Sequence, residues 1–325
     1  MMSAPLRLLA IGEVMAEIRA ADAPAGTPGI PPGIAPGIAP GIAPGFASGF
    51  AVQFGGDTYN TAVYAARLVG DVDSVAYLTR IGRDPLSTGW MEAARGEGIG
   101  VAHVERDPVR NIGIYTVSTD AYGERSFHYW RAESAARQLF AGEGMPLSLP
   151  EAEIIYLSGI TLAILTPPAR ERLTGLLAQR RAEGALVAFD SNYRATLWED
   201  VATARDAIRA LWDITDIALP SIDDEMALHD EVSEVAVVDR FAAQSWKGIA
   251  IKRGARGPVS PNLAADAHPD FTPATKVVDT TAAGDSFNGG YLAAFLDGAD
   301  EAARLAAGHD LAARVVSAPG AIIAK

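Results

Sequence analysis

Short apolar segments alternate along most of this chain with longer Ala-rich segments, and this alternation limits its fold more than any other feature. The apolar segments have the length of buried strands, and the Ala-rich segments space apolar residues three and four positions apart, as amphipathic helices do. We predict an α/β protein with a doubly wound, mostly parallel sheet and helices on both faces, in which ligands bind at the carboxyl ends of the strands. The predicted strands are 6–12, 75–81, 154–158, 186–190, 217–220, 248–252 and 276–278, and the predicted helices are 58–68, 85–95, 167–183, 202–212, 233–244, 285–296 and 301–317.

One region interrupts the alternation. Residues 101–104, 112–118 and 126–131 are strand-like segments with no helix between them. The turn-like sequence DAYGE joins the last two, so the region predicts an antiparallel β-flap. A flap beside a strand-end cleft would cover that cleft.

A four-residue repeat, PGIA with close variants, occupies residues 24–47 within a stretch that carries no charge. Proline at every fourth position removes helix donors and restricts the preceding residues, so the repeat predicts an extended, polyproline-like loop rather than a membrane span. Two interpretations stay open: a neutral low-complexity insertion, and an extension of a lid. We expect one domain over 1–325, with lid segments at about 13–54 and 101–131.

Composition excludes several classes of protein. Of the 325 residues, 49% are hydrophobic and 21% charged, which excludes a disordered chain, and a net charge of -13 disfavours nucleic acid as a partner. The chain has no cysteine, hence no disulfide, thiolate metal site or cysteine nucleophile. Its five histidines show no paired ligand spacing, and no serine lies in a nucleophile elbow. With no signal-peptide core and no membrane span in the sequence, we expect a cytoplasmic protein.

The sequence DTTAAGDSFNGG at 279–290 carries the most informative chemistry. A strand is predicted before it and a helix from about Asp285, so the backbone N–H groups of Ala282, Ala283 and Gly284 can converge at the positive end of a helix dipole. Small side chains let a phosphate reach these groups, and Asp285 can then take a proton from a hydroxyl beside that phosphate. The alternative is that Asp285 only caps its helix.

This sequence resembles the C-terminal signature of the ribokinase-like (PfkB) sugar kinases. FGGDTYNTAVYAARL at 54–68 resembles their N-terminal glycine signature. Between the two, IGRDPLSTGW, SGI, DSNYR, SIDDE and IKRGARG follow in the family's order, so the resemblance covers nearly the whole chain. It implies a ribokinase-like fold and a kinase that uses ATP and Mg²⁺, and leaves a requirement for a monovalent cation open. Because of GGDTYNTA at 55–62 and YWRAESAAR at 129–137, the chain is most similar to family members that phosphorylate 2-keto-3-deoxygluconate.

Two arginines favour an acidic substrate. In a strand Tyr129 and Arg131 share one face, and Arg194 follows a predicted strand end near Asp190. A guanidinium matches a carboxylate bidentately, whereas a neutral sugar is bound by side chains such as Asp and Asn. The alternatives are an exposed flap charge for Arg131 and a phosphate contact for Arg194.

The resemblance implies further contacts to the sugar. Gly55 and Gly56 would let the sugar approach the backbone, Asp57 and Asn60 would bind its hydroxyls, and Tyr115 would lie over its keto end. The alternatives are a helix N-cap for Asp57 and ordinary cross-strand packing for Tyr115.

The nucleotide site is expected without a Walker A sequence. The family often has Asn-x-x-Glu where this chain has Ser221 to Asp224, and the Asp224 carboxylate is expected to organise water around Mg²⁺. The resemblance places Ser221, Lys252 and Gly254 near the nucleotide, Gly257 in the adjoining turn, and His309 and Gly320 at the adenine pocket. A buried packing role is the alternative for His309.

We therefore expect an ATP-dependent sugar-acid kinase that makes a 6-phosphate. Mg²⁺ and the amides of residues 282–284 would hold the γ-phosphate while Asp285 deprotonates the terminal hydroxyl. Two other functions stay open: a kinase of a neutral sugar or nucleoside (fructose, ribose, adenosine), and a catalytically silent sugar-acid sensor. The expected partners are the sugar acid, ATP and a second copy bound through the β-flap, with no nucleic acid and no membrane.

Overall fold

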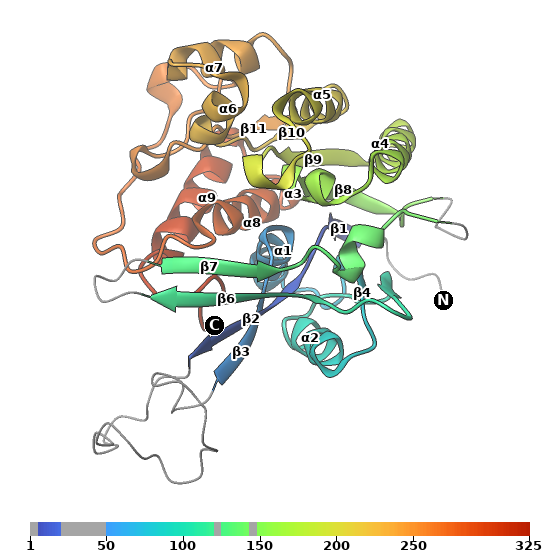
Figure 1. Cartoon of the computed structure of the whole chain (residues 1–325). Helices are drawn as coiled ribbons and strands as arrows, with labels where there is room; N and C mark the ends of the chain where they lie inside the picture. Colours follow the sequence, from blue (N-terminus) through green and yellow to red (C-terminus); the bar gives the residue numbers. More distant parts are fainter. Residues whose placement is uncertain (1–5, 21–49, 120–124, 143–147) are drawn as a thin grey trace, which may run out of the picture.

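The computed structural model describes residues 6–20, 50–119, 125–142 and 148–325 (Figure 1). A seven-stranded sheet forms its centre, in the order β11-β10-β9-β8-β1-β4-β5, and every neighbouring pair is parallel. Its strands are β1 (Leu6–Ile11), β4 (Val75–Ile81), β5 (Val104–Arg106), β8 (Ala152–Ser158), β9 (Leu186–Asp190), β10 (Ile217–Ala218) and β11 (Gly248–Ile249). The predicted parallel α/β sheet is confirmed.

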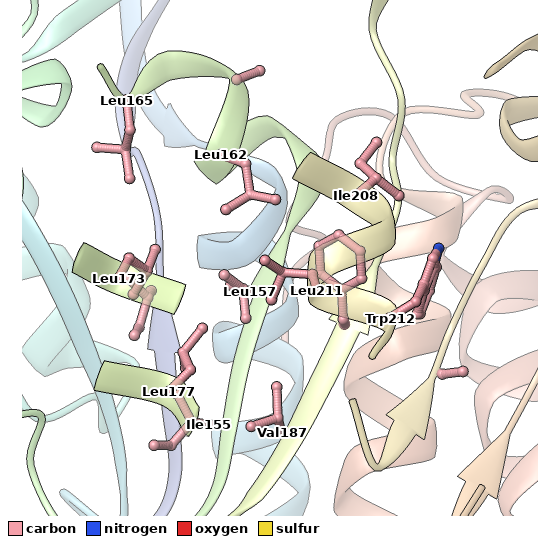
Figure 2. Packing of buried hydrophobic residues seen from close by; sticks show 14 of the residues in the cluster. Ile155, Leu157, Leu162, Leu165, Leu173, Leu177, Val187, Ile208, Leu211 and Trp212 are labelled. Atoms are coloured by element: carbon pink, nitrogen blue, oxygen red, sulfur yellow. The ribbon is translucent and has the colours of Figure 1, made fainter. Parts of the chain in front are cut away.

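Helices cover both faces of this sheet because successive residues of each buried strand point to opposite sides. Leu8 and Ala10 of β1 pack against one set of helices, and Leu9 and Ile11 pack against the other. The first set is α1 (Asp57–Val69), α2 (Pro85–Gly96), α8 (Ala283–Leu296) and α9 (Glu301–Val315). The second set is α3 (Gly159–Ile164), α4 (Pro167–Ala182), α5 (Val201–Trp212), α6 (Ile222–His229) and α7 (Glu234–Ala242). Figure 2 shows Ile155, Leu157 and Val187 of the sheet beside Leu173 and Leu177 of α4 and Ile208, Leu211 and Trp212 of α5.

A second sheet of four strands forms the predicted flap. Its order is β3-β2-β6-β7, with an antiparallel pair at each edge and a parallel pair, β2 and β6, at the centre. Figure 1 shows β6 and β7 as two green arrows outside the larger sheet. The strands are β2 (Met15–Ala20), β3 (Phe50–Gly55), β6 (Gly113–Thr119) and β7 (Arg125–Trp130). The flap segments 112–118 and 126–131 are thus confirmed, while the predicted turn at 120–124 and the repeat at 24–47 lie outside the described residues.

The structure corrects two predicted strands. Residues 101–104 were expected in the flap, but β5 at this place pairs in parallel with β4 of the larger sheet. Residues 276–278 form no strand, because the amides of Val278 and Asp279 both bond to the carbonyl of Val316, beyond α9, at 2.8 and 3.1 Å. Two short helices, α3 and α6, were not predicted, since each follows its strand without a polar break long enough to mark a separate element.

None of the helices in the described part of the chain combines the length and the apolarity needed to cross a bilayer.

Candidate active site

Two adjoining cavities lie at the carboxyl ends of the central strands. One, of about 420 Å³, is bounded by the flap, and we call it the flap cavity. The other, of about 390 Å³, extends toward α9, and we call it the α9 cavity. The residues common to both are Ser221, Lys252, Thr280, Ala283 and Gly284. The turn before α8 therefore forms part of the wall of each.

The turn before α8 has the conformation of an anion-binding site. Ala282 takes a left-handed conformation with φ 61°, and the helix begins at the next residue. The amide of Ala283 donates to the carbonyl of Thr280 at 3.2 Å. Among the described residues, the other two expected donors, Ala282 and Gly284, have no hydrogen-bond partner. Free amides at a helix N-terminus favour an anion, and here two of the three expected donors are free for one.

Asp285 lies in the first turn of α8 and lines the flap cavity. Its Oδ2 accepts a hydrogen bond from Nδ2 of Asn60 at 2.8 Å. Burial and the nearby carboxylate of Asp57 raise the pKa of Asp285 to about 7, although the Asn60 bond opposes that shift. A carboxylate with a pKa near neutral is suited to accept a proton at physiological pH.

Asp57 and Asn60 lie one turn apart on α1 but have different surroundings. Asp57 is not the N-cap, since that position belongs to Gly56; its Oδ2 accepts hydrogen bonds from Ser158 and, at 2.8 Å, from Asn192. Asp57 lines the flap cavity, whereas Asn60 lies behind Asp285 and holds it. Asn192 was not predicted as a site residue, although it lies inside the DSNYR motif.

The two signature glycines are required by close packing of the chain. A Cβ on Gly56 would lie 2.3 Å from the carbonyl oxygen of Glu13, and a Cβ on Gly55 would lie 2.8 Å from the hydroxyl of Tyr115. Gly56 lines the flap cavity and Gly55 does not. Because Gly55 has no Cβ, it leaves room for the Tyr115 side chain.

Two tyrosines from the flap face the cavity. Tyr115 and Tyr129 are opposite one another in the β6–β7 pair, with ring centroids 5.7 Å apart. The Tyr115 hydroxyl donates to Oε2 of Glu17 at 2.5 Å, and burial together with Glu17 raises the pKa of Tyr115, which keeps this hydroxyl a donor. Tyr115 thus combines cross-strand packing with a place in the cavity wall.

Both candidate arginines reach the flap cavity, and both are paired. Arg131 forms a buried ion pair with Glu13, whose Oε1 also accepts from the Ser134 hydroxyl at 2.5 Å. Arg194 contacts Asp224 at 3.0 Å through Nη1. Each arginine uses only one terminal nitrogen for its carboxylate, so part of each guanidinium remains available to a ligand. Glu13 was not predicted as a site residue, because the residues around it do not indicate a partner 118 positions further along the chain.

The α9 cavity holds several of the residues expected near a nucleotide. Ser221, Gly254 and His309 line it, and Nε2 of His309 is 2.9 Å from the carbonyl oxygen of Thr272. Its ring also packs against Phe271 at 5.0 Å, so the packing role exists alongside the cavity position.

Two glycines expected at the nucleotide lie outside this wall. Gly257 has φ 76°, and a Cβ there would lie 2.4 Å from the Phe271 ring. Gly320 has φ 89°, and its amide donates to Asp279. For both, backbone conformation accounts for the glycine.

Asp224 was expected to organise water around Mg²⁺. It lines the flap cavity, while its neighbour Asp223 lines the α9 cavity. Burial raises the pKa of Asp224, against the opposing effect of Arg194. The described residues contain no group of three or more metal-binding side chains. One or two carboxylates fit Mg²⁺ that is carried on nucleotide phosphates, because that ion keeps several of its waters.

Comparison with known proteins agrees with this geometry. The family model described as pfkB family carbohydrate kinase matches residues 44–325. The 2-dehydro-3-deoxygluconokinase of Escherichia coli (strain K12) is 40% identical over 280 residues, which cover 83% of this chain and 90% of that protein. A fructokinase of Klebsiella pneumoniae is 30% identical over 253 residues, which cover 74% of this chain and 76% of that one.

Among solved structures, a putative ribokinase II of E. coli in complex with ATP and Mg²⁺ is similar in fold. It has a TM-score of 0.76 at 22% identity, and the match covers 97% of this chain and 94% of that one. The family match spans most of the sequence and includes every residue of both cavities except Glu13 and Met15. The chain belongs to the PfkB family of carbohydrate kinases.

Proposed function

We propose that this carbohydrate kinase transfers the γ-phosphoryl group of ATP to the terminal hydroxyl of 2-keto-3-deoxygluconate, a sugar acid, and so makes its 6-phosphate. The observation that carries the proposal is the position of Asp285. It lies where the two cavities meet, beside free amides at the start of α8, with a pKa of about 7.

Each cavity would hold one substrate. ATP would occupy the α9 cavity, with its adenine toward His309 and its phosphates toward Gly284. Mg²⁺ carried on these phosphates would neutralise their charge, and Asp223 and Asp224, which line the two cavities, would hold its waters. The sugar would occupy the flap cavity, where Asp57 and Asn192 offer an acceptor and a donor to its hydroxyls.

The preference for an acid rests on the arginines and on the 40% identity to an E. coli 2-dehydro-3-deoxygluconokinase, 2-dehydro and 2-keto being two names for the same group. Arg131 and Arg194 both line the flap cavity, and each keeps donors that its carboxylate partner does not use. A substrate carboxylate bound there would form charge-assisted hydrogen bonds, which are about twice as strong as neutral ones.

One observation favours a second candidate, a kinase of a neutral sugar. Five carboxylates but only three cations line the flap cavity, so its charge does not by itself attract an acid. The carboxylates belong to Glu13, Asp57, Asp190, Asp224 and Asp285, and the cations to Arg131, Arg194 and Lys252.

A substrate screen separates the two candidates. ADP release is measured with 2-keto-3-deoxygluconate, fructose, ribose and adenosine, and the product is identified by phosphorus NMR. We expect kcat/KM for the acid to exceed that for fructose by at least about tenfold. Preference for fructose would replace the substrate proposal with the second candidate, and ADP release with none of these sugars would favour a silent sensor.

A further inference from the structure

A buried polar cluster lies beneath the junction of the two cavities. Its members are Tyr156 on β8, Asp190 at the end of β9, Lys252 after β11 and Asn288 on α8. Tyr156 and Asn288 are fully buried, and Asp190 and Lys252 are only 3% and 9% exposed. Burying a charge pair costs desolvation free energy, which is offset only when the geometry is good and further hydrogen bonds satisfy both groups.

The ammonium of Lys252 is held on one side only. Its Nζ donates to Oδ2 of Asp190 at 2.5 Å and to Oδ1 of Asn288 at 3.1 Å. No described residue accepts its third N–H. The turn before α8 is also close to Nζ, since a Cβ on Gly284 would be 3.6 Å from it. The free donor is therefore beside the turn that both cavities share.

The two residues that hold Lys252 are themselves fixed. Oδ1 of Asp190 accepts from the amide of Asn192 at 3.1 Å. Nδ2 of Asn288 donates to Oδ2 of Asp190 at 2.7 Å and to the hydroxyl of Tyr156 at 3.0 Å. Apart from the bond between Asn192 and Asp190, each of these contacts joins different segments of the chain, so several elements together fix the position of the ammonium. A charge fixed before the reaction stabilises developing charge without reorganisation.

We propose that Lys252 is a catalytic residue that contacts the phosphoryl group as it passes from the α9 cavity to the flap cavity, and that Asp190 and Asn288 are positioning residues that hold its ammonium there. This inference rests on the proposed kinase reaction, and it does not depend on which sugar is the acceptor.

The step balances as follows. The acceptor hydroxyl oxygen forms a bond to the γ-phosphorus, its proton moves to the Asp285 carboxylate, and the bond between the γ-phosphorus and the bridging oxygen breaks with its electron pair going to ADP. Lys252 keeps its proton throughout and donates a hydrogen bond to a non-bridging oxygen. It adds one cationic donor to the amides of Ala282 and Gly284.

The cluster also acts on the base. The charged groups that raise or lower the pKa of Asp285 are Asp57 on α1, Asp190 on β9 and Lys252 after β11, with Asn60 as a hydrogen-bond donor. Asp190 raises this pKa and Lys252 lowers it. Removal of the Asp190 charge and removal of the Lys252 charge should therefore shift the acidic limb of the pH profile of kcat/KM in opposite directions. A cluster with only a structural role would not produce these shifts.

The test uses K252M, D190N and N288A in the full-length protein, assayed with the best sugar of the substrate screen. We expect kcat to fall about 10²- to 10³-fold in K252M and about tenfold in the other two, with KM for the sugar changed less than about threefold. The acidic limb of kcat/KM should move to higher pH in K252M and to lower pH in D190N. In calorimetry, K252M should weaken binding of a non-hydrolysable ATP analogue at least about tenfold more than binding of ADP.

D216N is the matched control. Asp216 is also a buried carboxylate, 5% exposed and paired with Arg181, but it lines neither cavity. D216N should lower the melting temperature while kcat and the pH profile stay as in the wild type.

Any one of three results would overturn the inference. The first is a wild-type kcat in K252M, and the second is an equal loss of affinity for ADP and for the ATP analogue in K252M. The third is an acidic limb that lies at the same pH in K252M and D190N. If D190N does not fold, N288A and K252M still decide it. Wild-type preference for a neutral sugar overturns only the substrate proposal, because these ratios are measured within one substrate.

Discussion

The flap cavity has two walls that differ in how their side chains are held. We call Asp57, Asn192 and Asp285 the core wall, and Tyr115, Tyr129 and Arg131 the flap wall. Each core-wall side chain takes part in a hydrogen bond with another helix or strand end. On the flap wall, the side chains of Tyr115 and Arg131 are hydrogen-bonded, within the described part of the chain, only to Glu17 and Glu13 near the flap itself. Tyr129 is 52% exposed and contacts its neighbours through ring packing, with Tyr115 and the Arg131 guanidinium.

This difference separates two tasks. Proton transfer needs a base held in one position with a shifted pKa, and that requires burial and several partners. Recognition of one end of a sugar needs donors that a ligand can reach, which a partly exposed sheet supplies. We therefore expect changes to the core wall to act on kcat and changes to the flap wall to act on KM.

The largest effect is expected from D285N on the core wall. Without a carboxylate to accept the proton, kcat should fall about 10²- to 10⁴-fold while ATP binding, measured by calorimetry, stays within about threefold of wild type. The control is D297N, at the other end of α8, where Asp297 contacts Arg7 near the surface. Near-normal turnover of D285N would remove Asp285 from the mechanism.

R131L on the flap wall is expected to have the next largest effect. A charge-assisted pair contributes about 1.5–3 kcal/mol, so KM for the acid should rise about ten- to a hundredfold with little change in kcat. R110L is the control, because Arg110 contacts Glu133 outside the cavity. An equal loss of kcat/KM with acidic and with neutral sugars would mean that Arg131 stabilises the flap through Glu13 and does not bind the substrate carboxylate.

The pH dependence gives a third, smaller test of the core wall. Asp285 accepts a proton only when ionised, and burial with Asp57 raises its pKa to about 7. Below that pH, kcat/KM should fall about tenfold per unit, and above it the value should level off. An acidic limb near pH 4 would show that the free enzyme does not perturb this carboxylate.

Deletion of residues 28–44 is expected to have the smallest effect. Ala20 of β2 and Phe50 of β3 are partners in the antiparallel register, so the two strand ends are already adjacent. The deletion leaves residues 21–27 and 45–49, more than the about two to five residues that a hairpin connection needs. The melting temperature should change by less than about 3 °C, and a larger loss would show that the repeat packs on the fold. An unchanged KM for the sugar would show that the repeat does not act as a lid.

The sequence predicted what depends on local pattern. Strand and helix periods encode which residues face each side of the sheet, so the parallel architecture and the strand end at Asp190 followed from them. The turn at Ala282 and the position of the Asp285 carboxylate beside it followed from small residues next to an acid at a helix start. These are properties of a few adjacent residues.

Pairings across the chain were not predictable in the same way. Glu13 and Arg131 are 118 residues apart, and Lys252 and Asp190 are 62 apart. Each contact depends on the relative position of two sheets or of two strand ends. The sequence of a single segment does not determine that relative position. For the same reason the hydrogen bond from Asn60 on α1 to Asp285 could not be read from the sequence, and the contact of Asn60 with the sugar stays a prediction.

The β6–β7 hairpin joins the rest of the flap sheet through β2 alone, since β7 is an edge strand. Tyr115 and Tyr129 therefore belong to one hairpin, and Arg131 directly follows it, while Asp285 and its partners belong to the core. If the flap wall binds the sugar as proposed, we expect mutations in this hairpin to change substrate preference more than phosphoryl transfer. Exchange of this one hairpin is therefore the route that we propose for redesigning the substrate preference of the kinase.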